Sequence, residues 1–255
     1  MVGSLEAGAP CMGVIAAAEC HVWWADPLIS GEDLARHLDD AERERAARFR
    51  RPEDRLRYAA AHGLARLVLG ADLGEVPRKV RFETECARCG GPHGKPRLLG
   101  SGAAVDFSIS HSGRRVVVAA ARGVRVGVDV ESTARRYASD EPLVRGVLTP
   151  AEAEALTRVP ESRRAEAFFR YWTRKEAVLK ATGDGLTVPP ASVEVSGPDD
   201  PPHLLAWNAV PPLDAVVRLH DLSAGTGHCG VLALIGGPDL TIVERAFGDV
   251  LAGAR

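Results

Sequence analysis

Hydrophobic and polar residues alternate most regularly between Val124 and Glu131. Four valines take the even positions of this segment, and Arg125, Gly127, Asp129 and Glu131 take the odd positions. Strict alternation predicts a half-buried strand whose two faces differ in polarity. The two carboxylates therefore share one face of the predicted strand.

Shorter apolar segments predict further strands. They are residues 14–24, 105–110 and 116–121 before this strand, and residues 192–196, 216–219 and 231–235 after it. Proline-rich stretches at 198–202 and at Pro211 and Pro212 predict loops between the later strands.

Helical periodicity and capping residues predict the remaining elements. We expect a helix over residues 33–50, a second from Pro52 to a glycine stop at Gly70, and a third that runs from Phe169 to near Gly183. Thr149 and Glu152 have the spacing of a capping box, which predicts a further helix start there.

A weak internal repeat links the two longer helices. Arg57-Tyr58 precedes Gly70 at the same spacing as Arg170-Tyr171 precedes Gly183. We predict an α+β fold with a pseudo-twofold pair of similar α+β halves, residues 14–122 and 123–248, and an active site in the cleft between them.

Composition narrows the class of protein. The 255 residues are 45% hydrophobic and 26% charged, with a net charge of -2, as in an ordinary globular protein. This balance argues against a protein that binds nucleic acid or a membrane through global charge. Five cysteines, an odd number, and an N-terminus without a basic segment favour the cytoplasm over secretion.

The third predicted helix carries unusual chemistry. Trp172, Glu176 and Lys180 follow one another at four-residue spacing and share one helical face. Of 32 basic residues only four are lysines, namely Lys79, Lys95, Lys175 and Lys180. A chain that otherwise uses arginine indicates a site that needs the compact ammonium charge.

Asp129, Glu131 and Glu176 together suit a hard divalent cation. Mg²⁺ prefers carboxylate oxygens and leaves coordination positions for water and phosphate. We therefore predict these three residues as metal ligands, with Mn²⁺ as an alternative ion. Each motif taken alone is also typical of an ordinary solvated surface.

Two turns predict phosphate contacts. The segment FSISHSG presents Ser110 and His111 at a strand end, where hydroxyl and imidazole groups can donate to anionic oxygens. The turn GKP presents Lys95 and Pro96. A Ser-His catalytic pair is disfavoured because adjacent residues rarely reach hydrogen-bonding geometry.

These motifs resemble those of the surfactin-type 4'-phosphopantetheinyl transferases. GKP, FSISHSG, GVDVE and WTRKEAVLKATGDGL occur in the order and spacing of that family, and RRPEDRLRYAAAHGLAR and LTPAE are also similar to it. The resemblance implies a holo-(acyl-carrier-protein) synthase. Such an enzyme transfers the phosphopantetheine arm of coenzyme A to a serine of an apo acyl or peptidyl carrier protein, and it releases 3',5'-ADP.

The resemblance also implies roles for single residues. Asp129, Glu131 and Glu176 would hold Mg²⁺, Lys180 would contact the pyrophosphate with Lys175 close by, and Glu176 is a candidate base. The predicted nucleotide-phosphate contacts are Ser110, His111, Lys95, Pro96, Arg51 and Arg57. The carriers would belong to polyketide, peptide or fatty-acid synthesis, and we expect a monomer.

Alternatives stay open at this point. A metal-dependent nuclease or phosphohydrolase uses similar carboxylates and a lysine, and a non-catalytic module could bind coenzyme A or a carrier. The loop with Cys86, Cys89 and His93 offers three of the four ligands that a structural zinc site needs, so a plain loop is favoured.

Overall fold

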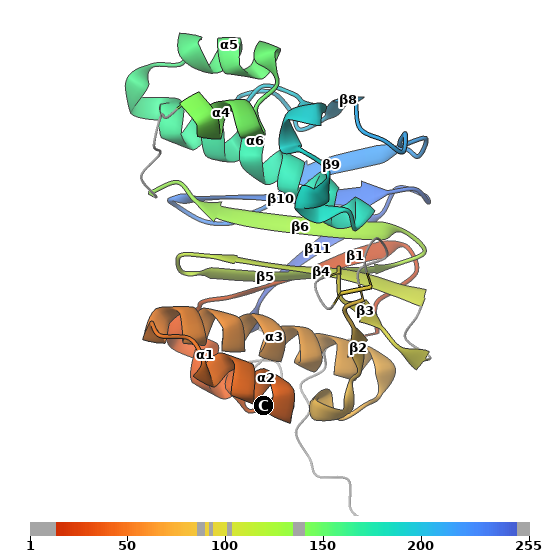
Figure 1. The fold of residues 1–255 in the computed structure, drawn as a ribbon. Coiled ribbons are helices and arrows are strands. Elements are labelled where there is room, and N and C mark those ends of the chain that lie inside the picture. Colours follow the sequence, from red (N-terminus) through yellow and green to blue (C-terminus); the bar gives the residue numbers. More distant parts are fainter. Residues whose placement is uncertain (1–13, 86–89, 92–93, 101–103, 135–140, 249–255) are drawn as a thin grey trace, which may run out of the picture.

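The computed structural model describes residues 14–85, 90–91, 94–100, 104–134 and 141–248. Two sheets lie face to face, and a long helix covers the outer side of each (Figure 1). Within these ranges, no helix is both long and apolar enough to cross a bilayer. The mixed α+β class predicted from the alternation and the helical periods is confirmed.

The first sheet combines strands from both ends of the chain. Its order is β11-β1-β5-β4, with β1 (Glu19–Ala25), β4 (Val105–Ser112), β5 (Arg115–Arg122) and β11 (Thr241–Ala246). β11 runs parallel to β1, and the other neighbours are antiparallel. The predicted division at residue 123 falls in the turn between β5 and β6, but the last strand returns to the first sheet.

The second sheet contains the alternating segment. Its order is β6-β10-β9, with β6 (Arg125–Ser132), β9 (Val217–Asp221) and β10 (His228–Ile235), all antiparallel. Two small sheets pair β2 (Phe82–Glu83) with β3 (Arg97–Leu98), and β7 (Val193–Val195) with β8 (Leu204–Trp207). The sequence pattern missed β8 and β11, which are short and half-exposed.

Six α-helices and three 3-10 turns complete the described chain. They are α1 (Pro27–Ala35), α2 (Asp40–Ala47), α3 (Pro52–Leu73), α4 (Glu141–Val147), α5 (Pro150–Arg158) and α6 (Glu161–Thr182), with 3-10 turns at Pro77–Lys79, Gly185–Thr187 and Pro190–Ser192. The predicted capping box of α5 is present, because Thr149 and Glu152 each bond the other's backbone N–H.

Two helix predictions need correction. The single helix expected over residues 33–50 is two helices, because Asp39 and Glu42 form a capping box that starts α2. The glycine stop of α3 is Gly74, with φ of 66°, rather than Gly70. The equal spacing that suggested a repeat is therefore not kept, and the pseudo-twofold relation stays a prediction.

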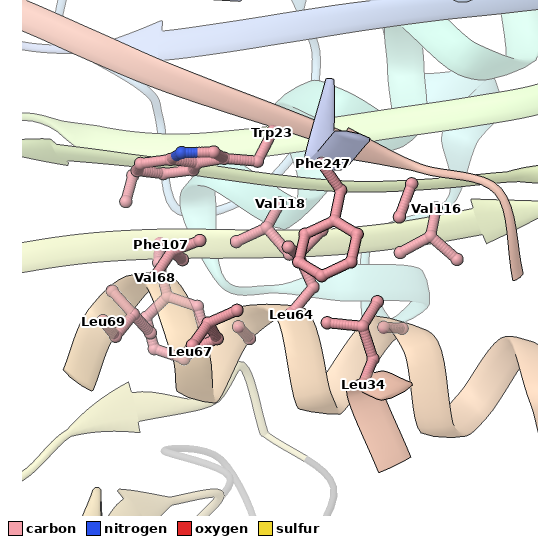
Figure 2. Close-up of a cluster of buried hydrophobic side chains, with 14 of the residues drawn as sticks. Trp23, Leu34, Leu64, Leu67, Val68, Leu69, Phe107, Val116, Val118 and Phe247 are labelled. Atoms are coloured by element: carbon pink, nitrogen blue, oxygen red, sulfur yellow. The ribbon is translucent and has the colours of Figure 1, made fainter. Parts of the chain in front are cut away.

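Three apolar layers hold the sheets and helices together. α3 packs on the outer face of the first sheet, where Leu64 and Val68 meet Phe107, Val118 and neighbouring side chains (Figure 2). α6 packs in the same way on the second sheet. The third cluster lies between the sheets and includes the valines of β6, so the alternating segment buries its apolar face as predicted.

A row of side chains joins β4 to β6 along the edge where the two sheets meet. Each member accepts a hydrogen bond from a β6 backbone N–H: Asp106 from Val126 (2.6 Å), Ser108 from Val128 (3.0 Å), Ser110 from Val130 (3.3 Å) and Ser112 from Ser132 (3.1 Å). We call these four residues the seam row. They replace the backbone ladder that two adjacent strands would otherwise form.

Candidate active site

Gly127 allows α6 to lie directly against β6. A Cβ atom at this position would be 2.0 Å from the carbonyl oxygen of Ala177 and 2.4 Å from the amide nitrogen of Ala181. Because the backbones approach so closely, the helical face that carries Glu176 and Lys180 lies over the polar face of β6. The tertiary contact thus brings the two predicted motifs together.

Lys180 pairs with the first strand carboxylate. Its Nζ lies 2.7 Å from Oδ1 of Asp129 and donates to the carbonyl oxygen of Val128 at 3.1 Å. Ser110 donates its hydroxyl to the same Oδ1 at 2.8 Å. A longer bond of 3.5 Å to the carbonyl oxygen of Ile109 on β4 completes the set, so the ammonium group is held at the seam by partners from both strands.

The carboxylates Asp129 and Glu176 carry perturbed protonation equilibria. Burial raises the pKa of Asp129, and the Lys180 charge opposes that change. Burial raises the pKa of Glu176 to about 6, and the negative charges of Asp129 and Glu131 add to the effect. Perturbed carboxylates that face one another in this way are typical of functional sites.

Two carboxylate oxygens at this point are buried without a partner. Oδ2 of Asp129 and Oε1 of Glu176 accept no hydrogen bond from any residue in the described ranges. A buried acceptor normally has a partner, and oxygen donors of this kind fit Mg²⁺. Within the same ranges, no three His, Cys, Asp or Glu side chains lie close enough together to bind one ion. The oxygen donors are therefore of the kind that Mg²⁺ prefers, but they do not yet surround a single point.

A cavity of about 990 Å³ opens over these groups. Among its lining residues are eight predicted from the sequence: Lys95, Pro96, Ser110, His111, Asp129, Glu131, Glu176 and Lys180. They come from both sheets, from α6 and from the segment before β3. The cavity thus spans the seam.

Lys95 is the second lysine of the cavity. Its Nζ pairs with Asp106 and donates to the carbonyl oxygen of Val126 at 2.8 Å. Burial lowers the pKa of Lys95, and Asp106 partly offsets this. One member of the seam row therefore also holds a cation at the cavity wall.

His111 lies among cations. Its pKa is lowered to about 4, first by partial removal from water and then by the charges of Lys180, Arg57 and His62. The ring is still partly exposed. With this pKa the imidazole is uncharged at neutral pH in the ligand-free protein.

Three predicted contacts do not line the cavity. Lys175 is fully buried, 2.5 Å from Glu152 Oε2, and donates to the carbonyl oxygen of Val147. Its ammonium group ties α6 to the α5 capping box and does not reach the cavity. Arg51 is exposed at the N-cap of α3, and Arg57 pairs with Asp54.

The cavity instead contains a cation and an imidazole that the sequence interpretation missed. Arg45 of α2 and His62 of α3 both line it. The Arg45 guanidinium lies 5.7 Å from the centre of the Tyr58 ring, and His62 Nδ1 lies 3.2 Å from Glu42. The four-residue spacing of Tyr58 and His62 was the available signal, since it places both on one face of α3. The predicted zinc ligands Cys86, Cys89 and His93 lie outside the described residues.

The segment that carries β6 and α6 is similar to known proteins. The family model described as the 4'-phosphopantetheinyl transferase superfamily matches residues 125–226, which hold β6 and α6. The 4'-phosphopantetheinyl transferase HetI of Nostoc sp. is 39% identical over 66% of this chain and 70% of its own. The 4'-phosphopantetheinyl transferase Sfp of Bacillus subtilis is 29% identical over 68% and 73%.

A solved structure was also compared. The holo-(acyl-carrier-protein) synthase of Bacillus anthracis, in complex with CoA (3',5'-ADP), aligns with a TM-score of 0.38 and 20% identity over 45% of this chain and 98% of that chain. The sequence relatives alone decide the classification. At 39% identity over more than two thirds of HetI, the chain belongs to the 4'-phosphopantetheinyl transferase superfamily.

Proposed function

We propose that this chain transfers the 4'-phosphopantetheine arm of coenzyme A to a serine of an apo carrier protein and releases 3',5'-ADP. One observation supports this most directly: Asp129, Glu131, Glu176 and Lys180 line one cavity that spans the seam, and all four lie in the segment that the family model matches. This reaction is the one that the name of the family describes, and the roles of single residues below are our proposals.

Asp129, Glu131 and Glu176 are the proposed ligands of Mg²⁺. The partnerless oxygens of Asp129 and Glu176 support this assignment. When bound, Mg²⁺ would neutralise charge on the pyrophosphate of coenzyme A. Mn²⁺ has the same preference for oxygen donors and is the alternative ion.

Lys180 is the proposed pyrophosphate contact. Its bonds to Asp129 and Val128 hold the ammonium group at the cavity wall. A positive charge that is already oriented stabilises developing phosphate charge without reorganisation during the reaction. Lys175, five residues earlier on α6, has a structural role in this proposal.

Glu176 is also the proposed base for the carrier serine. In the metal-free protein the pKa of Glu176 is raised to about 6, so the carboxylate is largely ionised at neutral pH and can accept a proton. Binding of Mg²⁺ would lower this pKa, so the role of base is secondary to the role of metal ligand. The attacking hydroxyl comes from the partner protein, so this chain needs no nucleophile of its own.

Lys95, Pro96, Ser110, His111 and Arg45 are proposed to line the path of the nucleotide phosphates. Lys95 and Arg45 supply positive charge on two walls of the cavity. A phosphate near His111 would raise the pKa of the ring and convert it into a charged donor. Arg51 and Arg57 would need side-chain movement to join them.

One experiment separates this function from the alternatives. The purified protein is mixed with coenzyme A, Mg²⁺ and an apo acyl or peptidyl carrier, and the carrier is weighed by mass spectrometry. A gain equal to one phosphopantetheine group is expected. An unchanged mass across several carriers, with cleavage of DNA or a phosphoester instead, would favour the hydrolase. Binding of coenzyme A without turnover would indicate a non-catalytic module.

Carrier identity and assembly state are further proposals. We propose a monomeric, cytoplasmic enzyme that acts on acyl or peptidyl carriers and binds neither nucleic acid nor membranes. The single chain already supplies both walls of the cavity, which supports a monomer.

A further inference from the structure

Three serines of the seam row lie beside the polar face of β6, opposite alternate residues of that strand. They are Ser108, Ser110 and Ser112. The serines accept backbone bonds from alternate residues of β6. The residues that precede those N–H groups are Gly127, Asp129 and Glu131. Each serine is thus placed beside one position of the strand face that carries the carboxylates.

Two of the three serines make a second hydrogen bond. Ser110 donates to Oδ1 of Asp129 at 2.8 Å, and Ser112 donates to Oε2 of Glu131 at 2.7 Å. Ser108 stands beside Gly127, which has no side chain to accept such a bond. Of the three serines, two therefore donate to a carboxylate, and Ser108 only joins the strands.

A serine hydroxyl has one donor and two acceptor lone pairs. The backbone N–H of Ser132 must bond to a lone pair of Ser112, so the single O–H proton is left for Glu131. The backbone bond consequently sets the direction in which the hydroxyl donates. A carboxylate has about four acceptor sites, and the Ser112 hydroxyl takes one of them.

Ser112 is itself held rigidly. It is buried, with 7% exposure, and it pairs with Arg115 across the two-residue turn between β4 and β5. Gly113 in that turn has φ of 55°, which a glycine adopts readily. The hydroxyl therefore has little freedom to move away from Glu131.

We propose that Ser112 is a positioning residue that restrains the Glu131 carboxylate at the cavity wall, where it serves as a ligand of the divalent cation. This inference rests on the proposed function, in which Glu131 is a metal ligand. Partners that orient metal ligands typically change metal affinity by about 10- to 100-fold when they are removed.

The test compares Ser112→Ala with Ser108→Ala. Both variants lose one backbone-to-hydroxyl bond of the seam row, but only Ser112→Ala loses a bond to a carboxylate. Mn²⁺ binding is measured by electron paramagnetic resonance in the presence of coenzyme A, and transfer rates are measured across a range of Mg²⁺ concentrations.

We expect the Mn²⁺ dissociation constant of Ser112→Ala to rise about 10-fold or more, and that of Ser108→Ala to match wild type. The rate of Ser112→Ala should recover at high Mg²⁺, since the defect lies in metal binding. Ser112→Thr keeps the hydroxyl and should restore the wild-type constant. Ser112→Cys keeps the volume but is a weak donor, so it should also weaken binding, which provides a test if Ser112→Ala does not fold.

Equal dissociation constants in the Ser112→Ala and Ser108→Ala variants would overturn the inference, as would equal weakening in Ser112→Ala and Ser112→Thr. A failure of the proposed function looks different. In that case wild type itself would bind Mn²⁺ no better than Asp129→Ala, or would transfer nothing to a carrier.

Discussion

At the scale of single residues, the ligand-free site holds carboxylates that repel one another and are partly removed from water. Glu176 is half-buried beside two further carboxylates, and its pKa rises from 4.5 to about 6. The positive charge of Lys180 offsets part of this cost by lowering the pKa of Glu176. Such a group destabilises the free protein and favours the binding of a cation.

Glu176→Gln should therefore stabilise the metal-free protein while it abolishes transfer. A raised carboxyl pKa means that the folded state holds the proton more tightly, so stability is lost as pH rises from 4.5 through 6. Above pH 6 the variant should be more stable by about 2 kcal/mol, and near pH 4 the two proteins should be equal. Urea unfolding with EDTA at pH 4, 5.5 and 8 measures this. A less stable variant at pH 8 would contradict it.

At the scale of elements, the contact between α6 and β6 assembles the site. Gly127 permits the approach, and the periodicity of α6 decides which side chains reach the strand. Lys175 and Lys180 are five residues apart, about 140° around the helix axis, so they face different surroundings. The same helix therefore supplies a structural ion pair with Glu152 and a cavity lysine.

Gly127→Ala should disrupt this contact. Its Cβ would overlap the carbonyl oxygen of Ala177, so α6 must move away from β6 and carry Glu176 with it. We expect a loss of roughly 1–3 kcal/mol of stability together with a large loss of transfer. Gly146→Ala is the control, since this glycine is an exposed residue of α4 and a Cβ there meets nothing within 4 Å. Thermal unfolding and the carrier mass assay check both variants, and an unperturbed Gly127→Ala enzyme would refute the role of the close approach.

At the scale of the whole molecule, the two sheets share a buried interface, and one strand from the C-terminal part of the chain belongs to the first sheet. The third apolar cluster takes Val22 and Val117 from the first sheet and Val128 and Leu232 from the second. β11 then pairs with β1, so the C-terminal part of the chain completes the first sheet. The proposed halves are structurally interdependent.

Fragments cut at Gly123 should not fold separately. Residues 1–123 would lack β11 and expose the inner face of the first sheet, while residues 124–255 would expose the valines of β6. We expect neither fragment alone to show cooperative thermal unfolding, and we expect co-expression of both to restore a complex. Cooperative unfolding of residues 1–123 by themselves would show that the first half is autonomous.

Local patterns determined much of this protein. The alternation of β6, the capping box of α5 and the spacing of Glu176 and Lys180 all depend on neighbours along the chain, so they can be read without coordinates. They were enough to predict the α+β class and eight of the residues that line the cavity. The rest depends on contacts between distant segments. Only packing decided that Arg45 rather than Arg51 lines the cavity and that Lys175 forms an ion pair with Glu152. Packing also decided that β11 pairs with β1 and that serines of β4 donate to the carboxylates of β6.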